Sequence, residues 1–306
     1  IRKEPIFDAK YVVSTYDSFV YNIVRIPVTE IFRSIKHYAI PRARIFTSTI
    51  VLDEAHLVFK EGVDVDSFLA SLSTIINYST VSKTPLILMS ATLNSSIREW
   101  INTWSSRKTI FFRLWRNESK HNNVFTIRDK GFESTALNIM WETKVVEEND
   151  VDKIILSEIA KGRRVLVIKY HVHDAIETYK KIINIVDPEK VALIHGRLNV
   201  HDRHIAMEKA RLVKVLVGTS VIEAGVDWSF DTLITDHPSP LSVAQQVGRI
   251  CRHVDGEVCK GKVYIVGKAH NIDLVKAIRE IKDKGKEVEW RLPYDTLRGF
   301  KREYIG

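Results

Sequence analysis

The chain has 306 residues, 45% of them hydrophobic and 27% charged, which is typical of a globular protein long enough for two domains. No apolar run approaches the roughly 20 residues of a membrane-spanning helix, and the first five residues lack a signal peptide's apolar core. We therefore expect a cytoplasmic protein. The net charge of +8 favours an anionic partner, nucleic acid above all, although the lysine-rich surface of a heat-adapted protein would give the same excess.

Two cysteines, Cys251 and Cys259, occur in the chain. Their spacing matches no metal-binding motif, and no further cysteine is there to build a disulfide framework with them. We therefore expect two buried or spare thiols, and neither a disulfide scaffold nor a zinc site.

The first predicted elements lie near the beginning of the chain. Residues 11–13 (Tyr-Val-Val) have the character of a strand, and residues 19–32 have the apolar pattern of a helix. Hydroxyl side chains, including that of Thr15, stand before this helix. Such groups can hold a phosphate, and they serve equally well as an ordinary helix cap. Thr15 is therefore a candidate contact to nucleic acid.

A short apolar segment, residues 50–52, predicts a buried strand, and Asp53 and Glu54 follow it directly. In open α/β sheets, ligands bind beyond the carboxyl ends of the strands, where these acids should stand. One such acid can hold the water shell of Mg²⁺ while the other orients the attacking water in phosphoryl transfer. Acids that cap a helix or face solvent are the alternative.

The next predicted elements are a helix at residues 68–78 and a buried strand at residues 85–89. The strand runs into Ser90-Ala91-Thr92. Two small hydroxyl side chains at the carboxyl end of a strand can respond to what the neighbouring strand's acids hold. A simple turn is the alternative.

Strands and helices alternate in the second half of the chain. Charge rises and the apolar period weakens in residues 116–149, which we expect to be a linker. The expected strands beyond it are residues 165–168, 191–194, 215–217, 233–234 and 263–266, and the expected helices are residues 174–186 and 202–211. This alternation predicts a doubly wound parallel sheet.

Two motifs in this half can bring backbone and charge to a ligand. Gly218-Thr219 and Gly225-Val226-Asp227 are glycine turns, and a glycine lets the backbone approach a ligand closely. Residues 245–252 (Gln-Gln-Val-Gly-Arg-Ile-Cys-Arg) place Arg249 and Arg252 three apart, on one face of an expected helix. Paired guanidinium groups bind phosphate oxygens and stabilise developing charge. A solvated helix that pairs with nearby acids is the alternative.

Four ordered motifs resemble those of superfamily-two helicases of the DEAH-box type, over residues 11–267. They are Asp-Glu-Ala-His at 53–56, Ser-Ala-Thr at 90–92, the segment 218–227, and Gln-x-x-Gly-Arg-x-x-Arg at 245–252. Residues 14–19, 221–227 and 245–249 are most similar to the helicase of type I CRISPR interference. The resemblance implies an α/β fold of two RecA-like, doubly wound parallel-sheet domains, the first incomplete at its N-terminus.

The corresponding domain boundaries can be placed on the sequence. We expect the remainder of the first RecA-like domain in residues 1–115, the linker in 116–149, the second RecA-like domain in 150–270 and a basic helical tail in 271–306.

The same resemblance implies ATP hydrolysis with Mg²⁺ between the two domains. Asp53 would hold the metal through water, and Glu54 would polarise the hydrolytic water. The remaining roles fall into three groups: coupling of nucleotide and nucleic acid by His56, Ser90, Thr92 and Gln245; contact with the nucleotide by Gly225, Asp227, Arg249 and Arg252; contact with the nucleic acid by Gly218, Thr219 and Arg197.

One departure from the family pattern concerns the phosphate loop. The sequence Gly-x-x-x-x-Gly-Lys-Ser/Thr occurs nowhere in the 306 residues. We therefore expect the upstream strands and the phosphate-loop lysine of the first domain to be missing here, and the chain alone to hydrolyse ATP weakly or not at all.

The resemblance implies an ATP-dependent motor on single-stranded DNA that works with a CRISPR ribonucleoprotein effector complex and an HD nuclease domain or subunit. The chain itself has no convincing His-Asp nuclease pattern. A docking module without ATPase activity is one alternative, favoured by the absent phosphate loop and opposed by the intact acids and arginines. An RNA or repair helicase of the same superfamily is another, because contacts to the backbone carry little base information.

Overall fold

The computed structural model describes residues 7–25, 39–55, 65–90, 95–105, 109–114, 118–121, 123–223, 227–253 and 258–291. The chain forms two compact units, one of Ile1–Phe111 and His121–Val124, the other of Phe112–Lys120 and Phe125–Gly306. Each unit has a hydrophobic core of its own. None of the helices in the described ranges has the length and apolar character needed to cross a lipid bilayer.

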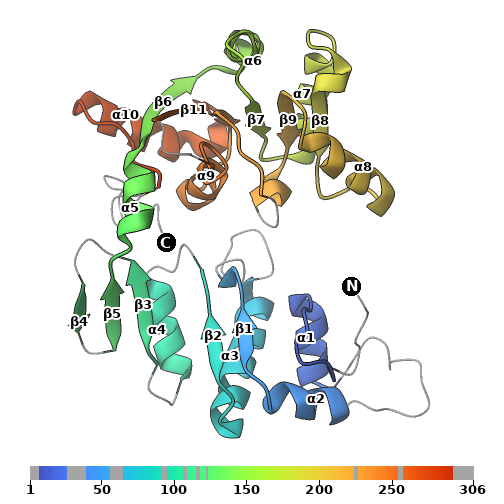
Figure 1. Ribbon diagram of the computed structural model, residues 1–306, viewed down its shortest axis with the longest axis vertical. Helices are drawn as coiled ribbons and strands as arrows, with labels where there is room; N and C mark the ends of the chain where they lie inside the picture. Colours follow the sequence, from blue (N-terminus) through green and yellow to red (C-terminus); the bar gives the residue numbers. More distant parts are fainter. Residues whose placement is uncertain are drawn as a thin grey trace. The chain divides into compact units, whose positions relative to one another are not determined.

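The first unit contains two short parallel strands, β1 (Ile50–Leu52) and β2 (Leu86–Leu88), at the predicted positions. They are not buried throughout as expected, because Val51 is 49% and Ile87 46% exposed. Its helices are α1 (Tyr16–Ile23), α2 (Ala39–Phe46), α3 (Val65–Ser82) and α4 (Ser95–Trp104), shown in blue to teal in Figure 1. A small core of Ile23, Ile45, Ile50 and Ile75 joins α1, α2, β1 and α3. The helix expected at residues 68–78 is confirmed within α3.

Two further expectations for this unit differ from the structure. Residues 11–13 form no strand; Tyr11 is 82% and Val13 95% exposed, so their strand-forming side chains find no sheet to cover. The helix expected at residues 19–32 begins earlier, because Thr15 caps its start, and α1 ends at Ile23, since Arg25 leaves it with a φ of 65°. Residues 26–32 of that expectation lie outside the described residues.

A three-stranded sheet of order β3-β5-β4 follows, made of β3 (Phe111–Leu114), β4 (Ser119–His121) and β5 (Val124–Ile127). Helix α5 (Lys130–Leu137) comes next, and its first turn is capped by the side chain of Asp129. The expected linker is therefore structured. Its last part, β6 (Ile139–Val146), belongs to the sheet of the second unit.

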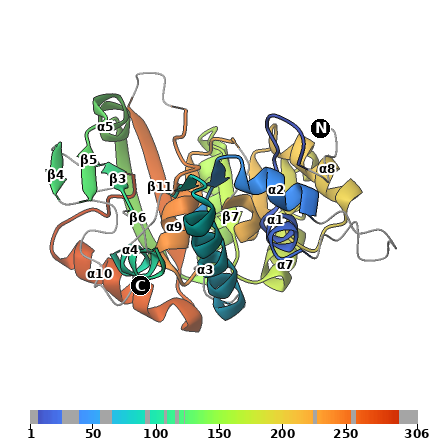
Figure 2. The same cartoon turned by 90° about the horizontal axis from the view of Figure 1, so that it is seen from below.

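The second unit is built on a six-stranded parallel sheet of order β6-β11-β10-β7-β9-β8. In addition to β6, this sheet contains β7 (Val165–Ile168), β8 (Val191–Ile194), β9 (Val215–Gly218), β10 (Thr232–Thr235) and β11 (Cys259–Val266). Figures 1 and 2 show β6 and β11 side by side, although about 110 residues separate them in the chain. All five strands expected beyond the linker are confirmed.

Helices cover both faces of this sheet. One face packs against α6 (Val151–Ala160) and α7 (Val172–Ile182), and the other against α8 (Val200–Ala210), α9 (Pro240–Val247) and α10 (Ile272–Asp283). Alternate residues of β7 serve the two cores, Val165 and Val167 on one side and Leu166 and Ile168 on the other. The unit is therefore doubly wound.

The expected C-terminal tail begins inside this unit. Leu274 and Ile278 of α10 are buried in its core. Beyond α10, the Trp290 indole donates to Thr143 Oγ1 at 3.0 Å, and the amide of Thr143 donates to Glu287 Oε1 at 3.1 Å. Residues 271–291 thus close over β6, while the basic residues from 292 onward lie outside the described ranges.

Candidate functional site

The acidic turn of the first unit directly follows β1. Asp53 is exposed and Glu54 is half-buried, and the amide of Glu54 donates to Asp53 Oδ1 at 2.9 Å. Glu54 has a φ of 51°, in the left-handed region that a non-glycine residue rarely adopts. The chain therefore leaves the strand in a sharp turn that presents two adjacent acids.

Hydrogen bonds tie this turn to the end of β2. The amide of Met89 donates to Leu52 O at 2.9 Å, and the amide of Ala55 donates to Met89 O at 2.8 Å. Ser90, the residue after Met89, is thereby brought beside the acidic turn. The expected coupling partners His56 and Thr92 lie outside the described residues, as does Gly225.

The chemistry of the acidic turn fits Mg²⁺ better than a softer metal, since carboxylate and hydroxyl oxygens are hard donors. Within the described part of the chain, no group of three or more His, Cys, Asp or Glu side chains could hold a metal by itself. Asp53 would therefore hold the ion through its water shell, and water and phosphate oxygens would be the direct ligands, as is usual for Mg²⁺.

Thr15 has a local role in the structure. Its side-chain oxygen accepts from the amide of Ser18 at 3.4 Å, which makes it the N-cap of α1. The next residue, Tyr16, bonds through its hydroxyl to Ser71 Oγ at 2.7 Å and stacks on Phe68, with ring centroids 5.5 Å apart. The segment thus anchors α1 on α3.

In the second unit, four charged residues follow neighbouring strands at the carboxyl edge of the sheet. Lys169, after β7, is 1% exposed, and its Nζ lies 2.7 Å from Glu148 Oε1 and 3.6 Å from Asp236 Oδ2. Lys268 Nζ lies 3.0 Å from Glu148 Oε2. The strand order reverses between β7 and β10, the usual ligand position of such sheets, and Lys169 and Asp236 occupy it as a buried pair.

The ends of β8 and β9 carry the expected nucleic-acid contacts. Arg197 is exposed, and Thr219 is 6% exposed. Because Ile194 pairs with Gly218 in the sheet, these two residues lie at the same edge. The amide of Arg197 donates to His195 Nδ1 at 3.2 Å. Burial, followed by the charges of Arg197 and Arg203, lowers the pKa of His195.

Gly218 is buried, and its lack of a side chain has a packing reason. A Cβ atom there would collide with the carbonyl oxygen of Ile194 and the side chain of Ile222. The glycine thus allows β9 to approach its neighbours. Its contact with nucleic acid stays a prediction.

The two arginine candidates do not share a helix face. Helix α9 ends at Val247, Gly248 is its C-cap, and Cys251 has a φ of 50°, so Arg249 and Arg252 lie on a turn after the helix. We call residues 248–253 the arginine turn. The expectation of one helical face is wrong because the backbone leaves the helix before either arginine.

Each arginine has its own partner in this unit. Arg249 is 8% exposed and donates through Nη2 to the carbonyl oxygen of Glu223 at 2.5 Å. Arg252 Nε lies 2.5 Å from Asp227 Oδ1, and both of these side chains reach solvent. The structure therefore brings together Arg252 and Asp227, two of the residues expected at the nucleotide.

A second glutamine, beside the one singled out from the sequence, reaches the arginine turn. Gln246 is fully buried, and its Nε2 donates to Glu223 Oε1 at 2.8 Å, whereas Gln245 is only half-buried. Glu223 thus accepts from Gln246 with its side chain and from Arg249 with its backbone. The sequence offered no means of choosing between two adjacent glutamines.

The cysteine prediction is wrong as well. Cys251 of the arginine turn and Cys259, the first residue of β11, form a disulfide with their Cα atoms 6.0 Å apart. The pairing of β10 with β11 brings two residues together that the spacing alone does not connect.

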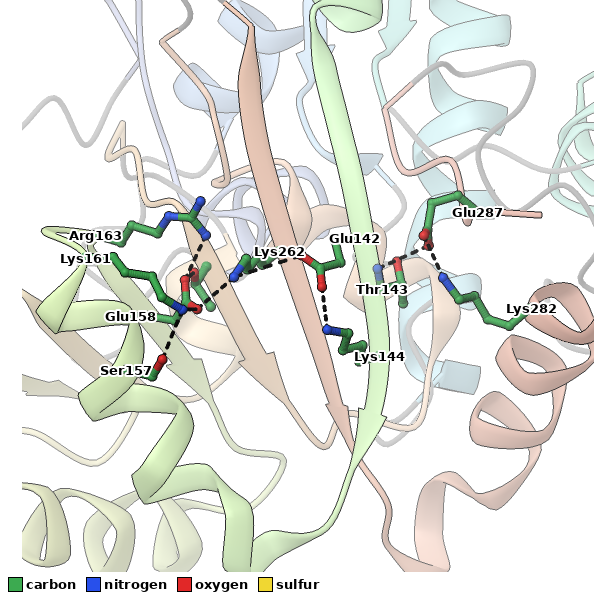
Figure 3. Close-up of polar contacts among 11 residues, drawn as sticks. Glu142, Thr143, Lys144, Ser157, Glu158, Lys161, Arg163, Lys262, Lys282 and Glu287 are labelled. Carbon is green, nitrogen blue, oxygen red and sulfur yellow. Dashed lines mark hydrogen bonds and ion pairs between the residues drawn. The ribbon is translucent and has the colours of Figure 1, made fainter. Parts of the chain in front are cut away.

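A separate ionic network lies between α6 and the sheet (Figure 3). Glu158, 1% exposed, accepts from Lys262 Nζ at 2.8 Å, Lys161 Nζ at 3.0 Å and Arg163 Nη1 at 2.8 Å. Burial alone would raise the pKa of Glu158, but the hydrogen bonds from Lys262, Lys161 and Arg163 outweigh it and lower the pKa to about 2. The network holds α6 on the sheet and contains none of the expected site residues.

The second unit is similar in sequence to a known protein family. Residues 161–255 match a family model described as CRISPR-associated nuclease/helicase Cas3, C-terminal. A CRISPR-associated nuclease/helicase Cas3 of Streptococcus thermophilus is 24% identical over 274 residues, which are 80% of this chain and 28% of that protein. The chain is most like the Cas3 group of superfamily-two helicases.

The chain is also similar to an RNA helicase in sequence and to a solved Cas3 structure in fold. The ATP-dependent RNA helicase dbp3 of Aspergillus clavatus is 26% identical over 212 residues, 66% of this chain and 38% of that protein. The crystal structure of T. fusca Cas3 with AMPPNP has a TM-score of 0.62 at 16% identity and covers 95% of this chain and 38% of that one. The expected RecA-like α/β fold is thereby confirmed, and the chain spans less than a third of the Streptococcus Cas3.

The match to the Cas3 model includes most of the second-unit site. It begins just before β7 and runs through the arginine turn, so it contains Arg197, Thr219, Asp227, Arg249 and Arg252. It ends before Cys259.

Proposed function

We propose that the chain is part of an ATP-dependent helicase that moves along single-stranded DNA in type I CRISPR interference. The observation that carries the proposal is the match of residues 161–255 to the Cas3 model, because this segment contains the arginine turn and Asp227. The acidic turn of the first unit supplies the complementary chemistry, since nucleotide hydrolysis needs both acids and cations around the phosphates.

In this proposal, the acidic turn handles metal and water. Asp53 would hold Mg²⁺ through water, and the bound ion would supply positive charge next to the phosphates. Glu54 orients the attacking water. Ser90 follows Met89, whose backbone is hydrogen-bonded to this turn, and this position suits the proposed coupling role.

The arginine turn stabilises negative charge in the same proposal. Arg249 leaves the carbonyl oxygen of Glu223, and Arg252 leaves Asp227, when the γ-phosphate offers both guanidinium groups a more negative partner. Nucleotide binding favours a closed state only through such contacts, so this exchange of partners is the link between ATP and motion.

Nucleic acid is proposed to cross the carboxyl edge of the six-stranded sheet. Arg197 is exposed there and Thr219 follows the neighbouring strand, so together they offer a cation and a hydroxyl to phosphates. Binding should weaken steeply with salt. We further propose that a CRISPR ribonucleoprotein complex delivers the DNA and that an HD nuclease, on the same or another polypeptide, acts on it.

The test is ATP hydrolysis with and without single-stranded DNA. It compares the 306-residue chain with the full-length product of its gene, and each with its Glu54→Gln variant. The 306 residues contain no phosphate-loop motif, so we expect DNA-stimulated turnover to be weak or absent in them and to appear with a phosphate loop present. If neither protein hydrolyses ATP while both bind DNA, a docking module replaces the motor.

An RNA track is the second candidate, favoured by the likeness to the RNA helicase dbp3 over 66% of the chain. Stimulation by DNA and RNA oligonucleotides of equal length and sequence separates the two. Turnover that rises only with RNA would exclude the DNA motor.

A further inference from the structure

The arginine turn is held at its centre, Cys251. This residue is 2% exposed, and its amide donates to Phe230 O at 2.8 Å. In return, the amide of Phe230 donates to Arg249 O at 2.9 Å. Two backbone hydrogen bonds thus fix the turn to Phe230, in the segment just before β10.

Two further ties reach Cys251 from distant parts of the chain. The disulfide joins it to Cys259 at the start of β11. Arg291, beyond α10, donates through Nη1 to the carbonyl oxygen of Cys251 at 2.9 Å. Cys251 lies between Arg249 and Arg252 in sequence, so whatever fixes its position also fixes the backbone from which both guanidinium groups extend.

We propose that the Cys251–Cys259 disulfide is a positioning element for Arg249 and Arg252, which makes turnover by the proposed ATPase depend on the thiol–disulfide state. The inference rests on the proposed function for its effect on turnover. Its effect on the arginine turn stands on the contacts above. Cys251 has a φ of 50°, which a residue with a Cβ adopts only when its surroundings enforce it. Breaking the cross-link removes one of the constraints that enforce it.

The chemistry is ordinary thiol–disulfide exchange with small-molecule thiols and disulfides. On oxidation, both cysteine thiols lose a proton, their sulfurs form one bond, and the two electrons reduce a small-molecule disulfide to two thiols. On reduction, an external thiolate attacks the Cys259 sulfur, because Cys259 is partly exposed whereas Cys251 is buried. Cys251 then leaves as a thiolate and takes up a proton, and Cys259 is left in a mixed disulfide with the small molecule. A second external thiolate attacks the small-molecule sulfur of that bond, so Cys259 leaves as a thiolate, takes up a proton, and one small-molecule disulfide is released.

The first experiment measures the bond and the turn directly, without ATP. Peptide mapping of the 306-residue chain under non-reducing conditions should join the Cys251 and Cys259 peptides. Hydrogen exchange should then show residues 249–253 exchanging at least about tenfold faster after reduction. The matched control is the Cys251→Ser, Cys259→Ser double variant, whose exchange in this turn should be fast and indifferent to the reductant.

The second experiment measures turnover in the full-length protein. Reduction should lower kcat about tenfold and change KM for ATP by a smaller factor, because the arginines stabilise the transition state more strongly than the bound nucleotide. Reoxidation should restore kcat in the wild type but not in the Cys251→Ser, Cys259→Ser double variant. If the full-length protein has no ATPase activity whether reduced or oxidised, the proposed function is wrong. The hydrogen-exchange experiment still tests whether the disulfide holds the arginine turn.

Three results would overturn the inference. They are two free thiols that persist after treatment with an oxidised dithiol, equal protection of the turn with and without reductant, and a kcat that reduction leaves unchanged in an active protein. Should the double variant fail to fold, reversible reduction of the wild type provides the same comparison.

Discussion

Arg252 Nε lies 2.5 Å from Asp227 Oδ1, so an arginine proposed to act on the γ-phosphate is held by a carboxylate on the same unit. The Asp227 side chain is 70% and that of Arg252 37% exposed. An ion pair open to water contributes little to stability, and its partners exchange readily. The pair therefore suits a residue that must change partners better than it suits a structural tie.

This pair yields a prediction that separates catalysis from stability. In an ATPase-competent full-length protein, Arg252→Ala should lower kcat roughly 10³-fold, because it removes a charge that stabilises the transition state. Asp227→Asn keeps the arginine and should lower kcat far less. Both changes should alter the free energy of unfolding by less than about 0.5 kcal/mol. Turnover rates and urea unfolding measure these effects, and an Arg252→Ala enzyme with wild-type kcat would remove the residue from the proposed mechanism.

Gly218 yields a prediction about stability. Gly218→Ala should destabilise the chain by about 2 kcal/mol or more, because the added Cβ meets a backbone oxygen, which cannot swing away like a side chain. The matched control is Gly196→Ala at the end of the neighbouring strand, where no atom lies within 4 Å of an added Cβ. Chemical denaturation of both variants gives the comparison. Equal stabilities would show that β9 shifts at no cost.

The Glu158 network predicts a large effect far from the expected site. Glu158→Gln should lower the free energy of unfolding by roughly 3 kcal/mol, because it leaves Lys262, Lys161 and Arg163 around a neutral side chain in a buried position. Glu177→Gln is the control, since it removes an acid that pairs with Lys180 on the surface. That variant should stay within about 0.5 kcal/mol of the wild type.

The carboxylate of Glu158 also predicts that the chain loses folding stability as the pH falls into the acid range. The pKa of Glu158 is about 2 in the folded chain, below its ordinary value of 4.5. Between these values the unfolded chain binds more protons, so the contribution of Glu158 is complete above about pH 5 and declines as the pH falls toward 2. The stability difference between wild type and Glu158→Gln should shrink over this range. A difference that stays constant from pH 7 to pH 3 would contradict the assignment.

The sequence predicts the strands of the second unit well because they are buried on both faces. Segments such as Val165–Ile168 and Val215–Gly218 are almost wholly apolar and are bounded by helices of regular length. β6 escapes this reasoning because it is an edge strand in which buried and exposed residues alternate irregularly. Because it contains polar residues such as Glu142 and Lys144, the sequence pattern predicts a linker there and not a strand.

The candidate site could be predicted residue by residue but not in its geometry. Asp53, Glu54, Arg249 and Arg252 stand out by type and spacing, yet a helical spacing rule cannot foresee that Gly248 ends α9 before the arginines. The disulfide and the contact of Arg291 with Cys251 depend on how β11 and the segment after α10 return to the turn. Such long-range pairings leave no mark in local sequence.

The position of β11 between β6 and β10 sets an order of events when the polypeptide is made. Among the strands that the structure describes, β6 pairs with β11 alone, so residues 139–146 must wait for this partner until residues 259–266 have left the ribosome. Loop closure over so many residues is slow. Until it occurs, β10 also presents an open edge, and a nascent chain that pauses before Cys259 exposes strands able to pair with other chains.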